Sequence, residues 1–259
     1  MTLLHGKSIL NTRAVHQAAE LTKKLEEYGG EVIEFPLISI SEPKDPRAVK
    51  EAIQKMENYQ WLVFTSANSV DFFIHYLKQA GKETTLLKEY KVAAVGNKTV
   101  MALEDFEVEV DLVPKQFDGV HLTEELVKVV SGPVLFPRSN LSSNHLINVL
   151  QNHNIKVDAP FVYETTYNFS NKIALNEALK LKHIDIITFT SPSTVHSFFQ
   201  QVNHSDKSLH DLSYAVIGTV TAKALKGYGI SEMIIPDSFT IESMVEAMID
   251  KENLMRGKA

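Results

Sequence analysis

The chain has 259 residues, of which 44% are hydrophobic and 22% charged, which is ordinary for a protein with buried cores and leaves room for one large or two ordinary domains. It contains no cysteine, which excludes a disulfide framework and a thiolate zinc site. Its 32 acidic and 26 basic residues give a formal net charge of −6. This balance disfavours a nucleic-acid surface but not a small anionic ligand, because backbone N–H groups bind anions without adding charge.

We expect a cytoplasmic protein without a membrane span. The first residues, Met1–Lys7, run directly into a predicted strand and lack the apolar core of a signal peptide. No stretch of about 18 consecutive apolar residues occurs, so the sequence predicts no transmembrane helix. The lack of cysteine fits a reducing compartment.

Short apolar strands alternate with amphipathic helices along the chain. In chain order, the predicted strands are 8–10, 61–64, 92–95, 184–189 and 214–217. Their hydrophobicity is continuous rather than alternating, which indicates strands covered on both faces, as in a parallel sheet. The predicted helices are 14–28, 68–79, 97–105, 141–151, 193–202 and 219–227. This order predicts an α/β fold with right-handed crossovers.

The first predicted helix shows the pattern most fully. One face carries the apolar residues Val15, Ala18, Leu21 and Leu25. Gly29 and Gly30 follow, and glycine commonly ends a helix. We therefore expect all four apolar side chains to pack against the sheet.

The chain contains an internal sequence repeat. The segment Phe64–Val70 is echoed by Phe189–Val195. Further matched pairs are Arg13 with Arg138, Gly96 with Gly218, and Thr99 with Thr221. A repeat this long predicts two similar lobes rather than a solenoid, and we expect each lobe to be a flavodoxin-like, doubly wound parallel sheet. Two lobes imply an open cleft between them, where ligands usually bind.

Two extended segments that contain proline interrupt the pattern. They are residues 37–43 and 158–167, which are roughly equivalent in the two copies. Proline limits such segments to edge or two-stranded pairing. We interpret them as paired crossover strands between the lobes and as the candidate hinge.

In each copy a buried strand ends in Thr-Ser and a helix begins within a few residues. The N-terminus of that helix offers unpaired N–H groups and the positive end of its dipole at the carboxyl edge of the sheet, which suits a carboxylate or a phosphate. Alternatively, the serines only cap helices, with Pro192 at a first helical position. The candidates are Thr65, Ser66, Ala67 and Asn68 in the first copy and Thr190, Ser191, Pro192 and Ser193 in the second.

A second matched pair of turns follows the next predicted strand of each copy. Glycine permits close approach of the backbone to a ligand, and the hydroxyls add donors. The alternative is a tight strand-to-helix turn without a ligand. Neither turn has the phosphate-loop pattern. The candidates are Gly96, Asn97, Lys98 and Thr99, matched by Gly218, Thr219 and Thr221.

Three further side chains are candidates, each with a structural alternative. Arg13 and Arg138 follow the first strand of their repeats, where an arginine either binds a carboxylate through two hydrogen bonds or forms a surface ion pair. Tyr163 lies in the second crossover, where either its phenol faces the cleft or its ring packs on a ribbon. The ten histidines show no metal-binding spacing, so no metal site is predicted.

A series of short motifs, taken in order, carries a resemblance to a known family. They are Leu10–Arg13, Phe35–Ile38, Phe64–Val70, Val95–Thr99, Val162–Thr165, Phe189–Ser193, Ile217–Ala222 and Pro236–Met244. With these motifs the chain resembles the uroporphyrinogen-III synthase family over nearly its whole length. The resemblance implies that residues 1–36 and 168–259 form one lobe and residues 44–157 the other. It also implies that 37–43 and 158–167 pair as a two-stranded antiparallel linker.

The resemblance further implies an enzyme without metal or cofactor. The family converts hydroxymethylbilane, a linear tetrapyrrole octacarboxylate, into uroporphyrinogen III, with loss of water and inversion of the terminal pyrrole ring through a spiro intermediate. The matched turns would hold the carboxylates, mostly through backbone N–H groups, and Tyr163 matches the family tyrosine thought to assist departure of the hydroxyl. The family resemblance also implies a monomer. Porphobilinogen deaminase, which supplies the substrate, is the candidate partner for a transient contact.

Two other function classes stay open from the residues alone. A bilobal small-molecule binding protein without catalysis has similar lobes and hinges, although the missing secretion signal argues against the periplasmic type. A nucleotide-using doubly wound enzyme would carry glycine fingerprints, which this sequence lacks.

Overall fold

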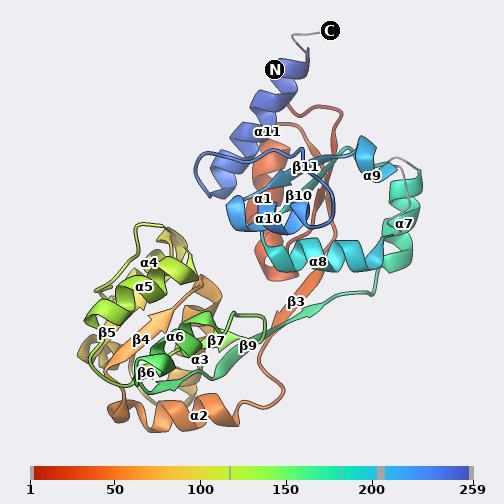
Figure 1. Cartoon of the computed structure of the whole chain (residues 1–259). Helices are drawn as coiled ribbons and strands as arrows, with labels where there is room; N and C mark the ends of the chain where they lie inside the picture. Colours follow the sequence, from red (N-terminus) through yellow and green to blue (C-terminus); the bar gives the residue numbers. More distant parts are fainter. Residues whose placement is uncertain (1–2, 117, 182, 203–207, 257–259) are drawn as a thin grey trace. The chain divides into compact units, whose positions relative to one another are not determined.

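The computed structural model describes residues 3–116, 118–181, 183–202 and 208–256, and it has an α/β architecture with parallel sheets, as predicted (Figure 1). The chain forms two compact units. Unit 1 comprises Met1–Ser39 and Thr166–Ala259, and unit 2 comprises Ile40–Thr165. The boundaries fall inside β3 (Ile38–Ser41) and β9 (Phe161–Tyr167). Within the described part of the chain, no helix is long and apolar enough to cross a bilayer.

Unit 1 is built on a four-stranded parallel sheet in the order β11-β10-β1-β2. Its strands are β1 (Ser8–Asn11), β2 (Glu31–Glu34), β10 (Ile186–Phe189) and β11 (Ser213–Val216). Its helices are α1 (Val15–Glu27), α7 (Lys172–Lys180), α8 (Pro192–Gln201), α9 (Ser208–Asp211), α10 (Thr219–Lys226) and α11 (Ile241–Arg256).

Helices cover both faces of this sheet. Leu10, Ile187 and Phe189 pack on one face in a cluster with side chains of α7, α8 and α10. On the other face, Ile9 and Ile186 pack in a cluster with side chains of α1 and α11. This two-sided burial is the reason for the continuous hydrophobicity of the strands, because alternate residues face two cores.

Unit 2 repeats the plan with a parallel sheet in the order β5-β4-β6-β8. Its strands are β4 (Trp61–Phe64), β5 (Lys91–Ala94), β6 (Val134–Leu135) and β8 (Val157–Asp158). Its helices are α2 (Arg47–Gln54), η1 (Met56–Asn58), α3 (Ala67–Gln79), η2 (Thr84–Glu89), α4 (Asn97–Glu104), α5 (Gly119–Val129) and α6 (His145–Asn152).

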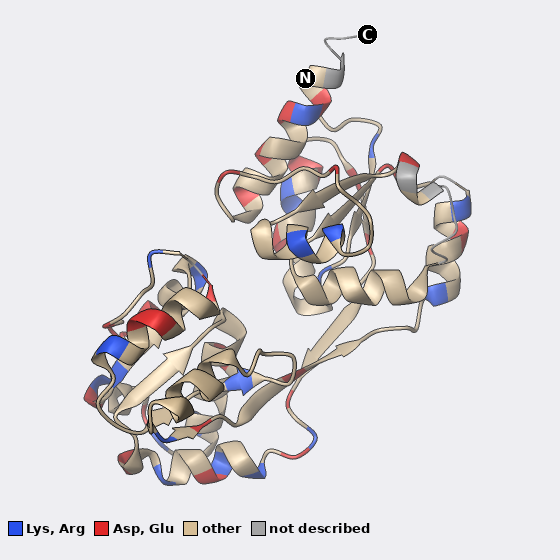
Figure 2. Cartoon of the chain, viewed as in Figure 1, with Lys and Arg blue, Asp and Glu red and all other residues tan. Residues whose placement is uncertain are grey.

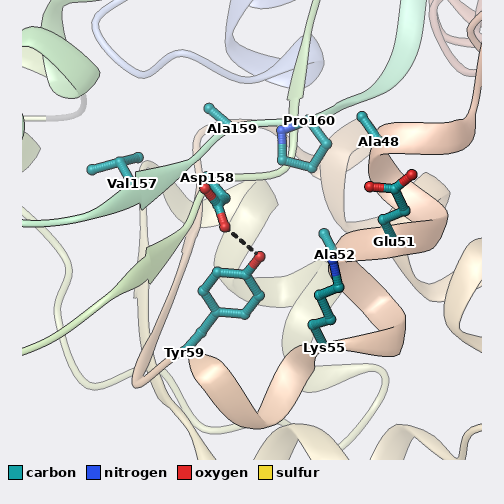
Figure 3. Close-up of a pocket in the computed structure, with 9 residues that line it drawn as sticks. All are labelled: Ala48, Glu51, Ala52, Lys55, Tyr59, Val157, Asp158, Ala159 and Pro160. Carbon is teal, nitrogen blue, oxygen red and sulfur yellow. Dashed lines mark hydrogen bonds between the residues drawn. The ribbon is translucent and has the colours of Figure 1, made fainter.

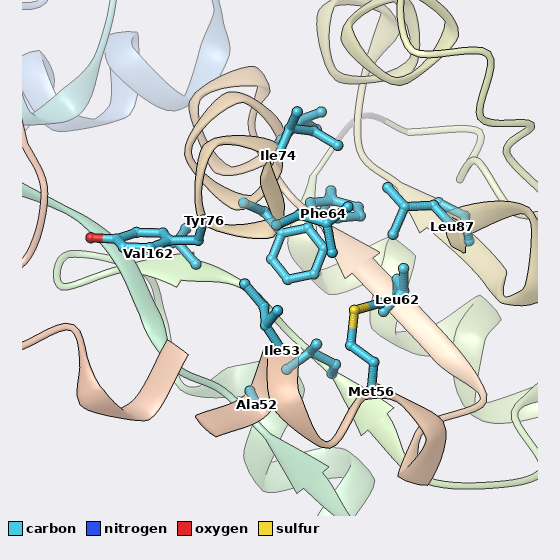
Figure 4. Close-up of a cluster of buried hydrophobic side chains, with 14 of the residues drawn as sticks. Ala52, Ile53, Met56, Leu62, Phe64, Ile74, Tyr76, Leu87 and Val162 are labelled. Carbon is cyan, nitrogen blue, oxygen red and sulfur yellow. The ribbon is translucent and has the colours of Figure 1, made fainter. Parts of the chain in front are cut away.

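Two buried clusters again lie on opposite faces of the sheet. Leu62 and Phe64 belong to a cluster with side chains of α2, α3 and α4, which Figure 4 shows. Trp61 and Val63 belong to a second cluster with side chains of α5 and α6. The cluster on the Phe64 face also contains Tyr163, so the core of unit 2 supports a predicted site residue.

A third, smaller sheet has the order β3-β9-β7, where β7 is Arg138–Ser139. The predicted limit to edge or two-stranded pairing is therefore wrong for residues 158–167, because β9 has a neighbour on each side, whereas β3 is an edge strand as predicted. The physical reason is the position of Pro160, which lies just before β9. Every residue of β9 thus keeps its N–H group for pairing.

Two details of the predicted helices are also wrong. Val15 is 73% exposed, whereas Ala18, Leu21 and Leu25 are buried. At about 100° per residue, Val15 lies about 90° from the mean direction of those three, so it points away from the sheet. The helix predicted from residue 141 begins at His145, because hydrogen bonds within 139–142 form a turn instead.

Candidate functional site

The two predicted Thr-Ser turns have the same capping geometry. The Ser66 side chain caps α3 by accepting a hydrogen bond from Ser69 N at 3.1 Å. Ser191 caps α8 in the same way, accepting from Thr194 N at 3.3 Å, and Pro192 is the first helical residue. The capping role predicted for both serines is therefore confirmed. Each cap uses one free N–H group of its helix, and helix N-termini carry several.

In unit 2, the turns that follow β4 and β5 lie next to each other at the carboxyl edge of the sheet. Val95 N donates to Phe64 O at 3.0 Å, which places Gly96 beside Thr65. Gly96 has a φ of 80°, a conformation that glycine adopts without strain. Because β6 lies on the other side of β4, this edge is also where the chain order of the sheet reverses. Ligands of open parallel sheets bind at such points.

Tyr163 belongs to the same edge of unit 2. Its phenolic oxygen lies 3.2 Å from Ser66 Oγ, and its ring stacks on Phe72 of α3 with centroids 5.5 Å apart. The residue is only 8% exposed. The ring therefore packs into the core, while its hydroxyl reaches the capping serine of a predicted anion-binding turn. Phe72 gave no signal in the sequence, because its role depends on the position of β9.

In unit 1, the corresponding edge gathers Arg13 and two turns. Ile217 N donates to Phe189 O at 3.0 Å, which places Gly218 beside Thr190. The adjacent strand β1 is held by Thr12 Oγ1, which donates to Thr188 O at 2.6 Å. Arg13 follows directly, so it lies at the carboxyl edge next to these turns. The gap between β1 and β10 is the point at which the strand order of this sheet reverses.

Arg13 is a mostly buried cation with a weak ion pair. Its side chain is 11% exposed, and Nη1 lies 3.6 Å from Glu20 Oε2. Its Nε is buried and has no hydrogen-bond partner among the described residues. Burial lowers the pKa of Arg13, and the nearby Glu20 partly opposes this. A carboxylate at this edge would therefore satisfy a donor that the protein leaves unpaired.

Arg138 is buried, which differs from the surface ion pair predicted as one of its two alternatives. It lies in β7, where it is 8% exposed, and its Nη1 donates to Asn144 Oδ1 at 2.7 Å. The guanidinium also lies over the Phe161 ring, 5.1 Å from the centroid. Burial lowers the pKa of Arg138. These contacts tie β7 to α6 and to β9. Like that of Arg13, the Nε of Arg138 is buried and has no hydrogen-bond partner in the described part of the chain.

The remaining candidates differ in exposure. Thr99 and Thr221 are each 3% exposed. Gly218 is buried against Phe239, and a Cβ atom on this glycine would lie only 3.0 Å from the nearest atom of the Phe239 ring. The exposed candidates are Asn97, Lys98 and Thr219. The half-buried candidates are Thr65, Ser66, Ala67, Asn68, Gly96, Thr190, Ser191, Pro192 and Ser193. The edges therefore offer mainly backbone and small side chains.

Two surface cavities of unit 2 are lined by other residues than these candidates. One cavity of about 380 Å³ is lined from α2, Tyr59 and residues 157–160 (Figure 3). Tyr59 donates to Asp158 Oδ2 at 2.7 Å there. A second cavity of about 630 Å³ has Tyr59, Lys91 and Asp111 among its lining residues. Figure 2 shows basic and acidic residues interspersed along the helices of both units.

Fold and site together define an α/β protein with hydroxyl-bearing turns at the carboxyl edge of two parallel sheets. The family model described as uroporphyrinogen-III synthase HemD matches residues 19–246. The chain is 32% identical to the uroporphyrinogen-III synthase of Chlorobaculum parvum, covering 94% of this chain and 98% of that protein. It is 30% identical to the porphyrin biosynthesis protein HemD of Ruminiclostridium josui, covering 95% of this chain but only 49% of that longer protein.

Solved structures agree on the fold. A mutant uroporphyrinogen III synthase from Thermus thermophilus aligns with a TM-score of 0.71 at 16% identity, covering 96% of this chain and 100% of that one. Uroporphyrinogen-III synthetase from Helicobacter pylori aligns with a TM-score of 0.59 at 19% identity, covering 95% of this chain and 99% of the other.

The chain belongs to the uroporphyrinogen-III synthase family, and the predicted membership is confirmed. The family consists of enzymes that cyclise hydroxymethylbilane in porphyrin biosynthesis. A binding protein without catalysis and a nucleotide-using enzyme are both disfavoured by this result.

Proposed function

We propose that this chain cyclises hydroxymethylbilane to uroporphyrinogen III, with loss of water and inversion of the terminal pyrrole ring. Family membership gives the reaction. The single observation in the site that carries the proposal is the Tyr163 phenol, which lies 3.2 Å from Ser66 Oγ at the N-terminus of α3. There a proton donor lies next to a turn suited to a substrate carboxylate.

The reaction needs only modest acid catalysis but close control of the substrate's conformation. Electrons from the pyrrole nitrogen expel the hydroxyl of the substrate, and Tyr163 O–H supplies the proton that lets it leave as water. The resulting azafulvene cation is attacked by the substituted carbon of the terminal ring, giving the spiro intermediate, which fragments and recloses. The ring carbon that forms the last bond loses its proton, which restores the neutral phenol of Tyr163. Unaided closure gives the uninverted isomer. Holding the ends of the chain in the productive geometry is therefore the main task of the protein, and orientation alone contributes several kcal/mol.

We propose that the substrate carboxylates bind mainly to backbone N–H groups at the helix N-termini after β4, β5, β10 and β11. The low exposure of Thr99 and Thr221 supports backbone rather than hydroxyl contacts at the second pair of turns. Arg13 adds one charged contact in unit 1. Distributed binding of this kind suits an octacarboxylate, because no single group carries most of the affinity.

The finer architecture is part of the same proposal. The strand order of each sheet supports two flavodoxin-like lobes, and the family supports an open cleft with residues 37–43 and 158–167 as an antiparallel linker and hinge. We propose lobes of 1–36 with 168–259 and of 44–157. A monomeric state, a cytoplasmic location and a transient contact with porphobilinogen deaminase stay predictions.

A coupled assay tests the function directly. Porphobilinogen deaminase generates hydroxymethylbilane in situ, the protein is added, and the oxidised products are separated as isomers I and III. Isomer III in excess over the control without protein supports the proposal. Isomer I alone, from protein shown to be folded, contradicts it and favours a bilobal binding protein.

Ser66→Ala is expected to have a mild effect on turnover. The change removes the cap of α3, which costs about 1 kcal/mol of stability, but it leaves the backbone N–H groups in place. The rate of isomer III formation is therefore expected to fall by no more than about tenfold, the equivalent of one hydrogen bond. Ser191→Ala, which removes the matched cap in unit 1, is the control. A thousandfold loss from Ser66→Ala alone would refute distributed binding.

Arg13→Gln is expected to weaken substrate binding more than chemistry. A charge-assisted hydrogen bond to a carboxylate is worth about 1.5–3 kcal/mol, so KM is expected to rise about tenfold or more while kcat changes little. Arg138→Gln is the comparison, and we expect it to lower the thermal midpoint and leave KM near the wild-type value. A higher KM for Arg138→Gln than for Arg13→Gln would reverse the roles assigned to the two arginines.

A further inference from the structure

On its β7 side, the strand that carries Tyr163 loses its backbone partner level with this residue. β9 pairs with β7 through Arg138 with Phe161 and Ser139 with Tyr163, and the register shifts between the two pairs. β7 ends at Ser139. On this side of β9, the named strand pairing therefore stops level with Tyr163, and the residues beyond it need another support.

The side chain of Asn140 supplies that support. Thr165 N donates to Asn140 Oδ1 at 2.8 Å, and Asn140 Nδ2 donates to Thr165 O at 3.2 Å. The amide of Asn140 thus imitates a peptide group and continues the ladder by one step. Thr165 lies two residues after Tyr163, so both side chains point to the same face of the strand, and both are buried.

Asn140 is itself held in a rigid turn. Ser139 N donates to Ser142 Oγ at 3.1 Å, and Leu141 N donates to Ser139 Oγ at 3.0 Å. Ser142 N also donates to Ser139 O at 3.2 Å. Arg138 connects the start of this turn to Asn144, the N-cap residue of α6. These hydrogen bonds fix the backbone from which the Asn140 side chain extends to β9.

The position of β9 decides where the phenol lies. The hydroxyl of Tyr163 meets Ser66 Oγ at 3.2 Å, and its ring stacks on Phe72. Both partners belong to the first turns of α3, whereas Tyr163 itself moves with β9. A shift of about 1 Å in β9 is enough to remove a group from its productive geometry.

We propose that Asn140 is a positioning residue, which fixes Tyr163 through its paired hydrogen bonds to Thr165. The inference rests on the proposed function of Tyr163 and adds a residue that itself touches neither the phenol nor the reacting atoms. Its chemistry is specific, because only a side-chain amide presents a donor and an acceptor to one backbone residue in this way.

A double-mutant cycle with Asn140→Ala and Tyr163→Phe tests the proposal in the coupled assay. We expect Asn140→Ala to lower kcat about tenfold with little change in KM, because the phenol is misplaced while the carboxylate contacts stay. If Asn140 acts through Tyr163, the double variant is expected to be no slower than Tyr163→Phe alone. Asn152→Ala, which removes the same amide from the exposed end of α6, is the matched control.

Three outcomes overturn the proposal. The first is an Asn140→Ala variant with the wild-type kcat. The second is a double variant whose loss of kcat is the product of the losses in Asn140→Ala and Tyr163→Phe. The third is hydrogen exchange of the Thr165 amide that is as slow in Asn140→Ala as in the wild type. If Asn140→Ala does not fold, Asn140→Asp keeps the acceptor for Thr165 N and takes its place in the cycle. If the wild-type protein forms isomer III and the Tyr163→Phe variant is equally active, the proposed role of Tyr163 itself is refuted.

Discussion

Tyr163→Phe is expected to slow the formation of isomer III by at least about a hundredfold, the usual contribution of a positioned proton donor. The change removes one oxygen, which lies within hydrogen-bond distance of Ser66 Oγ. The ring keeps its place against Phe72 and in the core cluster of unit 2. Stability is therefore expected to stay near the wild-type value, so that the loss falls on kcat. Single-turnover kinetics with freshly generated hydroxymethylbilane measure it.

Tyr59→Phe is the matched control for this experiment. Tyr59 also has a phenol with one hydrogen bond, to Asp158, and burial together with that bond raises the pKa of Tyr59. Tyr59 precedes β4, however, whereas Ser66 follows it, so the two residues lie at opposite ends of that strand. We expect Tyr59→Phe to cost about 1 kcal/mol of stability and to leave turnover unchanged. Full turnover by folded Tyr163→Phe, or equal losses in both variants, would rule out the proton-donor role.

Local patterns in the sequence predict the strands β1, β4, β5, β10 and β11 and the two serine caps, because each depends on neighbouring residues, whereas the short strands β2, β6, β7 and β8 were not predicted. The hydrogen bond that Thr194 Oγ1 donates to Ser191 O has its counterpart in unit 2, where Ser69 Oγ donates to Ser66 O. The same turn chemistry in both copies explains why the duplication was visible. Two of the family motifs, Phe64–Val70 and Phe189–Ser193, lie on these turns, and the comparisons confirm the family to which the whole set points.

Contacts between distant segments could not be predicted in this way. Asn140 pairs with Thr165, and Phe72 stacks on Tyr163, only because β7 and α3 both border β9. Arg138 follows a strand in sequence just as Arg13 does, yet it is drawn into a structural contact with Asn144. Helices α2, α5 and α11 were not predicted, although α2 places its buried residues Val49, Ala52 and Ile53 at helical spacing. The pairing of distant segments thus decides which candidate residues meet.

Phe64→Ala is expected to destabilise unit 2 strongly and unit 1 little. Phe64 is fully buried (Figure 4). Its ring packs edge-on with that of Phe73, with centroids 5.6 Å apart. Its repeat partner Phe189 meets Phe198 at 5.5 Å in unit 1. Truncating a buried phenylalanine leaves a cavity and costs about 3–5 kcal/mol. Because the two pairs lie in separate clusters, each loss is expected to stay within its own unit.

Hydrogen exchange read by mass spectrometry checks this prediction unit by unit. Phe64→Ala is expected to lower the protection of β4 and β5 and to leave β10 and β11 as in the wild type, while Phe189→Ala gives the reverse pattern. Phe239→Ala, which truncates a half-exposed ring, is the control. Equal loss of protection in both units would mean that they unfold as one. Because Tyr163 shares the cluster of Phe64, turnover is expected to fall further in Phe64→Ala than in Phe189→Ala at equal loss of stability.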